Sequence, residues 1–87
     1  MSDLEEILLD NGLEGAAYFV DDDFDTAIIG YTDDGRLVYS YDEMVEWYKN
    51  KYEVDDITAM EWLDYNTVRT VPYMGATKPI IVYSLIR

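Results

Sequence analysis

The chain contains no cysteine and no histidine among its 87 residues. The first absence excludes a disulfide framework and thiolate chemistry, and the second removes the commonest metal ligand and acid–base residue. Ser2, Ser40 and Ser84 therefore have no histidine base, and the five glycines are scattered instead of forming a phosphate-binding motif. We expect a protein that is not an enzyme and that holds no cofactor and no metal.

Carboxylates are the acid–base groups that remain, because 19 residues are Asp or Glu. A glycosidase would need two of them held about 5–10 Å apart across a substrate cleft. A chain of 87 residues forms one domain, residues 1–87, with a single modest core. A domain of that size with one thin sheet leaves little room for such a cleft.

Long apolar runs are also missing. A run such as Ile80–Tyr83 is far too short to cross a bilayer. The run Ile7–Leu9 near the N-terminus has no basic segment before it, which is unlike a signal peptide. We therefore expect a cytoplasmic location.

Basic residues are scarce: there are six, against 19 acids, so the net charge is −13. The imbalance lies in the first half, since residues 1–43 hold thirteen acids and one base, whereas residues 44–87 hold six acids and five bases. Nucleic-acid phosphates and anionic membranes repel such a chain, and basic surfaces attract it. Direct binding to nucleic acid or to a membrane is therefore not expected.

A β-hairpin is the element around which the rest of the chain is expected to be organised. Two runs rich in β-branched and aromatic residues, Thr26–Tyr31 and Arg36–Tyr41, flank the sequence Thr32-Asp33-Asp34-Gly35. Asp and Gly are the residues that a tight turn requires. The period of two places Ile29 and Tyr31 on the same face of the first strand.

The N-terminal residues predict a short helix over Asp3–Asp10. Ser2 is its expected N-cap, in a capping box. Leu4, Ile7 and Leu8 then lie on one helical face.

Two more helices follow the hairpin. Apolar residues recur at helical spacing from Tyr41 to Tyr52, after Ser40 as the N-cap. Asp55 is the expected N-cap of the third helix, which should end near Asn66–Arg69. The reason is that Pro72 pushes the residue before it toward extended geometry.

Two further segments have strand character. Ala16–Val20 is a candidate edge strand, and Pro79–Leu85 predicts a last strand that is central or covered on both sides, since apolar residues fall on both of its faces. The expected fold is α+β: a three- or four-stranded antiparallel sheet with about three helices, packed mainly on one face.

An acidic loop, Asp21-Asp22-Asp23-Phe24-Asp25, precedes the hairpin. Asp21, Asp23 and Asp25 have the spacing of the first three ligands in an EF-hand. However, Thr26 and Thr32 stand where glycine and a bidentate glutamate are needed. The sequence favours a solvated loop that Phe24 anchors in the core, and it leaves weak calcium binding open.

The acidic half is the leading candidate for a binding site. If its carboxylates project from one side, they could imitate the phosphates of a nucleic acid and occupy a basic protein surface, such as that of a nucleic-acid-binding protein. The alternative is that the charge only keeps a small protein in solution. The candidate residues are Asp21, Asp22, Asp23, Asp25, Asp33, Asp34, Asp42 and Glu43.

An aromatic C-terminal region provides the alternative interface. Its candidate residues are Trp62, Tyr65, Arg69 and Tyr73. Nine tyrosines and two tryptophans exceed what so small a core can bury, and Tyr, Trp and Arg are favoured at interface centres. Such a surface would suit a self-associating or structural module, including a homodimer, although half-buried aromatic rings are also ordinary parts of a core.

Three segments, Phe24–Gly30, Met44–Trp47 and Glu61–Tyr73, resemble uncharacterised small acidic proteins of Gram-positive gut bacteria, their phages and their mobile elements. The similarity runs from about Asp23 to Leu85, so it leaves the first helix unmatched. The resemblance implies a role in a phage or mobile element, including anti-defence activity or regulatory inhibition. It brings no known activity and no catalytic residue.

Overall fold

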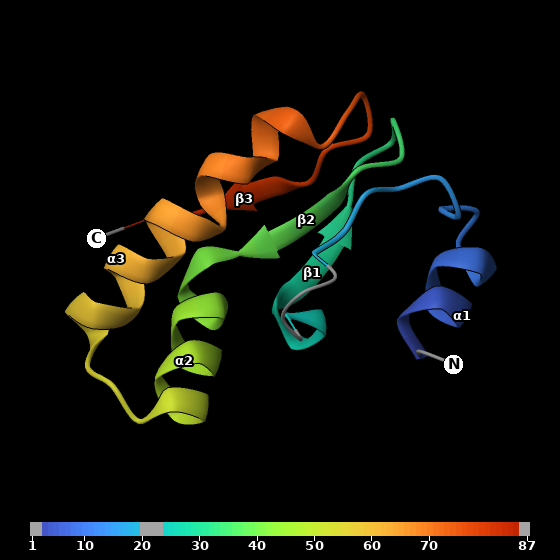
Figure 1. Cartoon of the computed structure of the whole chain (residues 1–87). Helices are drawn as coiled ribbons and strands as arrows, with labels where there is room; N and C mark the ends of the chain where they lie inside the picture. The colour runs from blue at the N-terminus through green and yellow to red at the C-terminus, as the bar shows by residue number, and fades with distance from the viewer. Residues whose placement is uncertain (1–2, 20–23, 86–87) are drawn as a thin grey trace.

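A computed structural model describes residues 3–19 and 24–85 of the chain. It contains three α-helices and three strands, which confirms the expected α+β class (Figure 1). In chain order the elements are α1 (Asp3–Asp10), the 3-10 helix η1 (Asp25–Ala27), β1 (Ile28–Tyr31), β2 (Leu37–Ser40), α2 (Tyr41–Tyr52), α3 (Asp56–Asn66), the 3-10 helix η2 (Val68–Tyr73) and β3 (Ile80–Val82).

The sheet is mixed, with the strand order β1-β2-β3. β1 and β2 are antiparallel, as expected, but β3 runs parallel to β2, so the prediction of a wholly antiparallel sheet was wrong. A parallel neighbour requires a crossover connection. Here α2, α3 and η2 supply it, and η2 carries the chain back toward the hairpin turn before β3 begins (Figure 1).

The position of β3 also differs from the prediction. It is an edge strand of three residues, and it is neither central nor covered on both sides. Val82 is 37% exposed. Pro79 is buried directly before the strand, a position that proline can occupy because no ladder hydrogen bond is needed from its nitrogen.

The hairpin turn forms as the sequence predicts. The Thr32 amide donates to the Arg36 carbonyl (2.8 Å), and the Gly35 amide donates to the Thr32 carbonyl (3.0 Å). Gly35 has a φ of +83°, a conformation in which glycine carries no steric penalty.

A register shift changes the faces of β1. Ile28 pairs with Tyr39 and Gly30 pairs with Val38, so Ile29 is an extra residue between the two pairs. Such a bulge interrupts the alternation of side chains. As a result Ile28 packs against the core, while Ile29 is 61% exposed.

Ala16–Phe19 forms no strand, and Val20 lies outside the described residues. The segment is held by isolated hydrogen bonds instead of a ladder. The Ala17 amide donates to the Thr77 carbonyl (3.3 Å), and the Phe19 amide donates to the Tyr39 hydroxyl (3.4 Å). The candidate edge strand is therefore wrong for the described part of its range, and the sheet has three strands.

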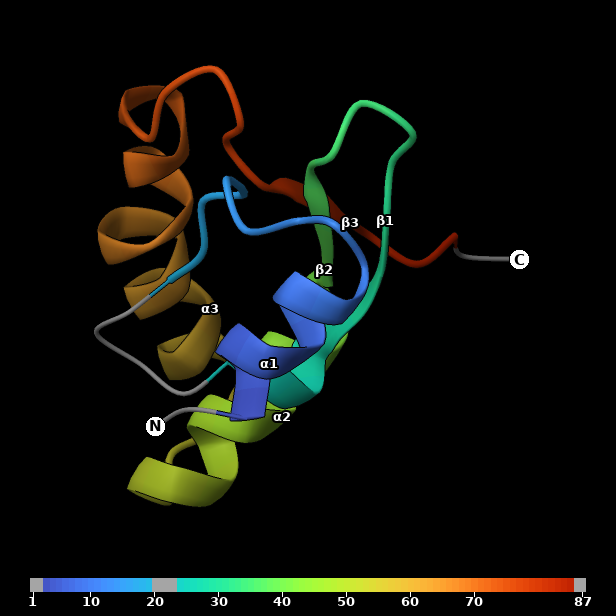
Figure 2. The same cartoon turned by 90° about the vertical axis from the view of Figure 1, so that its right-hand side faces the viewer.

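The core lies against one face of β2. Leu37 and Tyr39 are buried and alternate with the partly exposed Val38. α3 and η2 stand on one side of the sheet (Figure 2). Phe24 is completely buried, which confirms its expected role as the anchor before the hairpin. The other buried members of the core are Leu4, Leu8, Leu13, Ala16, Ala27, Tyr41, Met44, Val45, Tyr48, Ala59 and Leu63.

The helix α1 has the expected bounds but a narrower buried face. Leu4 and Leu8 are buried, whereas Ile7 is 56% exposed. The helix ends at Asp10, the following Gly12 has a φ of +72°, and the Leu13 amide donates to the Leu8 carbonyl (2.7 Å). This pair of features is a Schellman motif. The expected N-cap Ser2 lies outside the described residues.

The segment before Pro72 is helical, contrary to the expectation of extended geometry. α3 ends at Asn66, as predicted, but the chain continues as the 3-10 helix η2 through Pro72. At the two ends of η2, the Thr70 amide donates to the Thr67 carbonyl (3.1 Å) and the Met74 amide donates to the Val71 carbonyl (3.0 Å). These bonds do not involve the nitrogen of Pro72, so the proline is tolerated.

Truncation of Leu63 tests the packing of α3. Leu63 is completely buried, so Leu63→Ala should lower the free energy of unfolding by about 3 kcal/mol through lost burial and a cavity. Ile57 lies on the same helix and is 68% exposed, so Ile57→Ala should change stability by less than about 0.5 kcal/mol. Urea denaturation measures both, and equal losses would contradict the placement of α3.

Candidate functional site

The helix α2 presents a row of carboxylates on its exposed side. Its start is fixed at Ser40, whose hydroxyl accepts a hydrogen bond from the Glu43 amide (3.4 Å). Asp42 and Glu43 lie in the first turn, where the helix dipole favours negative charge. Glu46 follows Glu43 by three residues and so lies on the same side of the helix.

The start of α3 adds two more carboxylates. The Thr58 amide donates to Asp55 Oδ1 (2.8 Å), which makes Asp55 the N-cap that the sequence predicts. Hydrogen bonds from the side chain and backbone of Thr58 lower the pKa of Asp55, so this carboxyl is ionised at neutral pH. Asp56 is the first residue of the helix.

Of the hollows beside these carboxylates, two are lined mainly by residues of α2. One, of about 510 Å³, is lined by Thr26, Glu43, Glu46, Trp47, Asn50 and Lys51. The other, of about 310 Å³, is lined by Tyr41, Asp42, Glu43, Val45, Glu46, Asp56 and Met60. Glu43 and Glu46 line both hollows and form the ridge between them. We define the α2 acidic face as Asp42, Glu43, Glu46, Asp55 and Asp56, all of which are exposed.

A single base lies within this face. Lys49 Nζ is 3.3 Å from Glu46 Oε1 and also forms an ion pair with Asp56 Oδ1, and the hydrogen bond with Asp56 raises the pKa of Lys49. Within residues 3–19 and 24–85, both ion pairs go to this lysine. One ammonium therefore ties α2 to α3 and leaves most of the face's negative charge uncompensated.

Three other bases of the described chain, Arg36, Lys51 and Arg69, contact groups that are not carboxylates. Arg36 Nε donates to the backbone carbonyl of Lys78 (2.8 Å). Lys51 and Arg69 lie over aromatic rings, at 4.8 and 4.9 Å from the ring centroids. Cation–π contacts of this kind hold the charge against a ring face and neutralise no acid.

The structure separates the predicted acidic residues into two groups. Asp42 and Glu43 lie on α2, and η1, which contains the half-buried Asp25, packs against that helix. Asp33 and Asp34 are exposed at the hairpin turn, at the far end of the four-residue strand β2. That strand is about 13 Å long. Asp21, Asp22 and Asp23 lie outside the described residues.

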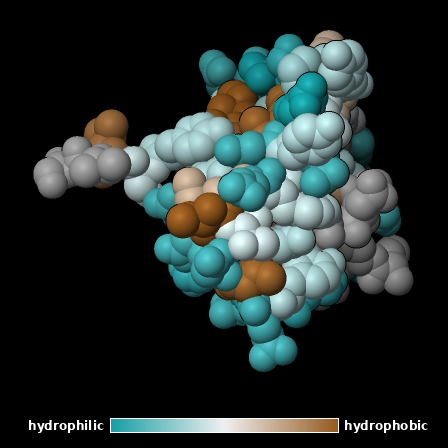
Figure 3. Space-filling model, turned by 60° about the vertical axis from the view of Figure 1, so that its left-hand side comes forward, coloured by the Kyte–Doolittle hydropathy of each residue, from teal (hydrophilic) through white to brown (hydrophobic). Residues whose placement is uncertain are grey.

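Only some residues of the alternative interface are exposed at the surface. Trp62 is half-buried and stacks on Tyr48 with ring centroids 4.7 Å apart, so it belongs to the packing between α2 and α3. Tyr65 is 69% exposed under the Arg69 guanidinium, and Tyr73 is 89% exposed in η2. On the face that Figure 3 shows, the most apolar side chains form separate patches among hydrophilic ones.

The hydroxyl of Tyr41 joins the two helices that carry the acidic face. Tyr41 is 4% exposed, and its hydroxyl donates to Asp64 Oδ1 (2.8 Å). Its ring also lies 4.6 Å from that of Tyr83, which follows β3. Burial, and then the bond to Asp64, raise the pKa of Tyr41. This contact joins the first turn of α2 to α3 and so holds the carboxylates in place.

Sequence reasoning missed part of the site. From the sequence, Asp55 was assigned only a capping role, and Glu46, Asp56, Trp47 and Asn50 were assigned no part in a binding site. The spacing of Glu43 and Glu46 was a usable signal, because residues three apart share a helix face. The addition of Asp56 depends on how α2 and α3 pack, which no local pattern states.

No protein-family model, no curated protein and no solved structure matches this chain. In the part of the chain that the structure describes, no helix combines the length and apolar content that a membrane span requires. What the protein binds is therefore inferred from the chemistry of its own surface.

Raising the pH above 10 is expected to destabilise the protein. Burial raises the pKa of Tyr39 to about 12 and raises the pKa of Tyr41 as well, whereas an unfolded tyrosine loses its proton near pH 10. Above that pH the folded state holds protons that the unfolded state has released. The free energy of unfolding should then fall by up to about 1.4 kcal/mol per pH unit for each tyrosine.

Urea denaturation at several pH values between about 9 and about 11.5 measures the slope of the free energy of unfolding against pH. Tyr41→Phe should make the slope shallower, because it removes one of the two protons. Tyr65→Phe is the control, since Tyr65 is 69% exposed, and it should leave the slope unchanged. A stability that stays level across this range would contradict the burial of both hydroxyls.

Proposed function

We propose that this protein is a non-enzymatic binding protein that uses the α2 acidic face to occupy a basic surface on another protein. The observation that carries the proposal is the charge balance of that face. Asp42, Glu43, Glu46, Asp55 and Asp56 are exposed together, and Lys49 is the base paired with them in the described chain. A concentration of one sign of charge steers association with the opposite sign.

The partner class that suits this face is a nucleic-acid-binding protein. Such proteins present lysines and arginines arranged to meet phosphates, and a row of carboxylates offers them a similar pattern of negative charge. In this proposal the chain acts in the cytoplasm as an inhibitor of a host protein. An anti-defence or regulatory role in a phage or mobile element agrees with the sequence resemblance.

A second candidate is self-association through the exposed aromatic residues. Tyr65 and Tyr73 are 69% and 89% exposed, and Arg69 lies beside Tyr65. Large aromatic side chains and arginine are the residue types that dominate interface centres. The region after Asp64 contains no acid, so two copies of a chain with charge −13 could meet there with least repulsion.

Charge-neutralising variants test the first candidate. Capture of a partner from host lysate, followed by measurement of its affinity, should show binding that weakens steeply as salt rises from about 50 to about 500 mM. The triple variant Asp42→Asn, Glu43→Gln, Glu46→Gln should weaken binding at least about tenfold, because it removes the centre of the face.

The matched control removes the same charge elsewhere. Glu5, Glu6 and Glu14 are exposed acids of the N-terminal segment, and their triple Gln variant should change the affinity less than about threefold. Equal losses in the two triple variants would show that only net charge matters. Binding that is insensitive to salt would remove the electrostatic basis altogether.

The two candidates predict opposite effects of salt. Self-association must overcome repulsion between two chains of charge −13, so screening should strengthen it. Sedimentation velocity at several concentrations measures the effect, and the double variant Tyr65→Ala, Tyr73→Ala should keep the protein monomeric. A strict monomer at every concentration and salt level rules the second candidate out.

A further inference from the structure

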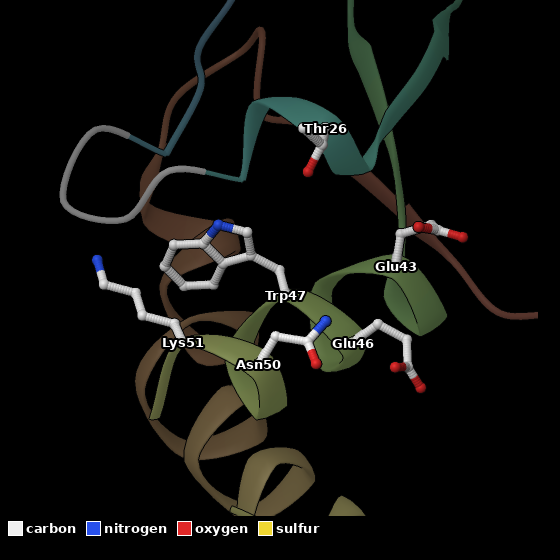
Figure 4. A pocket seen from close by; sticks show the side chains of 6 residues that line it. All are labelled: Thr26, Glu43, Glu46, Trp47, Asn50 and Lys51. Atoms are coloured by element: carbon white, nitrogen blue, oxygen red, sulfur yellow. The ribbon is translucent and has the colours of Figure 1, made fainter. Parts of the chain in front are cut away.

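The larger hollow beside the α2 acidic face contains an aromatic ring. It lies between η1 and α2 and has a volume of about 510 Å³. The ring of Trp47 lies in it, beneath η1, and the Thr26 hydroxyl points toward the ring from above (Figure 4). Glu43 stands at one end, Lys51 at the other, and the Asn50 amide on the near side (Figure 4). We call this space the Trp47 hollow.

The ring of Trp47 is held in place from inside the protein. It packs edge-to-face against the completely buried Phe24, with centroids 4.7 Å apart. A side chain that is fixed before binding loses little conformational entropy when a ligand arrives. Trp47 is therefore a pre-formed wall of the hollow.

A cation already rests against this wall. Lys51 Nζ lies 4.8 Å from the centroid of the Trp47 ring and 5.6 Å from that of Tyr52. The negative face of an aromatic ring attracts cations, and the Glu43 and Glu46 carboxylates at the rim have the charge to do the same. Lys51 is an exposed side chain on a flexible stem, so an incoming cation can displace it.

We propose that the Trp47 hollow binds an arginine side chain of the basic partner. This inference rests on the proposed function and names the residue type that the acidic face would anchor. A guanidinium is planar, so it can stack on the Trp47 ring, and it has five N–H donors. The carboxylate of Glu43 and the hydroxyl of Thr26 are acceptors that the hollow offers.

The same residues disfavour other ligands. A phosphate or carboxylate would meet two glutamates, Glu43 and Glu46, with Lys51 as the base in the lining. A lysine could approach the carboxylates, but its compact ammonium gains neither the planar stacking nor the bidentate bond. The hollow should therefore discriminate arginine from lysine, which a uniformly acidic surface does not do.

Two short peptides of equal charge test the discrimination. Titration with Gly-Arg-Arg-Arg-Gly should give a dissociation constant at least about fivefold lower than titration with Gly-Lys-Lys-Lys-Gly. The indole N–H signals in NMR spectra locate the site, because the chain has two tryptophans. The Trp47 signal should move with the arginine peptide, and the Trp62 signal, assigned with Trp62→Phe, should not.

Charge-matched variants test the acceptor and the internal cation separately. Glu43→Gln should weaken binding of the arginine peptide about tenfold, while Glu61→Gln, an exposed acid of α3 outside the hollow, should change it less than about twofold. Lys51→Gln should strengthen binding more than Lys78→Gln does, although both remove one positive charge, because only Lys51 competes for the ring.

The outcomes separate this inference from the proposed function. Equal affinity for the two peptides, with both indole signals unmoved and binding still lowered by salt, would overturn the arginine site and leave the acidic face intact. Failure of both peptides to bind at low salt would overturn the two together. If Lys51→Gln and Lys78→Gln bind the arginine peptide with equal affinity, Lys51 does not occupy the ligand's place.

Discussion

The direct join of β2 to α2 is the constraint on which the rest of the molecule depends. Ser40 is the last residue of the central strand and also the N-cap of the helix, so no linker separates the two. Tyr39, immediately before it, is buried and accepts a hydrogen bond from the Phe19 amide. Because β2 is fixed by a neighbour on each side, the direction of α2 and of its carboxylates is fixed with it.

Aromatic packing carries the acidic face. Trp47 contacts Phe24, and Tyr48 stacks on Trp62. These rings bind the inner side of α2 to η1 and α3, while the outer side holds carboxylates that repel one another. In a folded protein of net charge −13, the free energy gained by burying large apolar side chains must exceed the repulsion between these carboxylates. The same helix is thus apolar inside and charged outside, as an amphipathic helix must be.

Local patterns in the sequence predicted most elements because their causes are local. The turn at Gly35 needs a residue that accepts a positive φ, and the caps Ser40 and Asp55 need a side-chain oxygen next to free amides. The bulge at Ile29 and the helical turn through Pro72 were missed. Both are set by what the neighbouring segments require, and a periodicity count does not include that.

The candidate site divides in the same way. The sequence identified Asp42 and Glu43, which belong to the face, and it grouped them with Asp33 and Asp34, which lie beyond β2 at the hairpin turn. Closeness along the chain suggested one cluster. In a strand, however, each residue advances the chain by about 3.3 Å. The eight positions from Asp34 to Asp42 include the strand β2, so the turn carboxylates lie far from those of the helix.

By itself, the sequence determined the α+β class, the hairpin, the three helices and the acidic excess, because composition, caps and periodicity act through residues that are close along the chain. Only the tertiary structure decided that β3 runs parallel to β2 and that Asp56 joins Glu46 across Lys49. It also placed Trp47 in a hollow beneath Thr26. These features depend on which distant segments bury their apolar faces together, and that is a property of the whole packed chain.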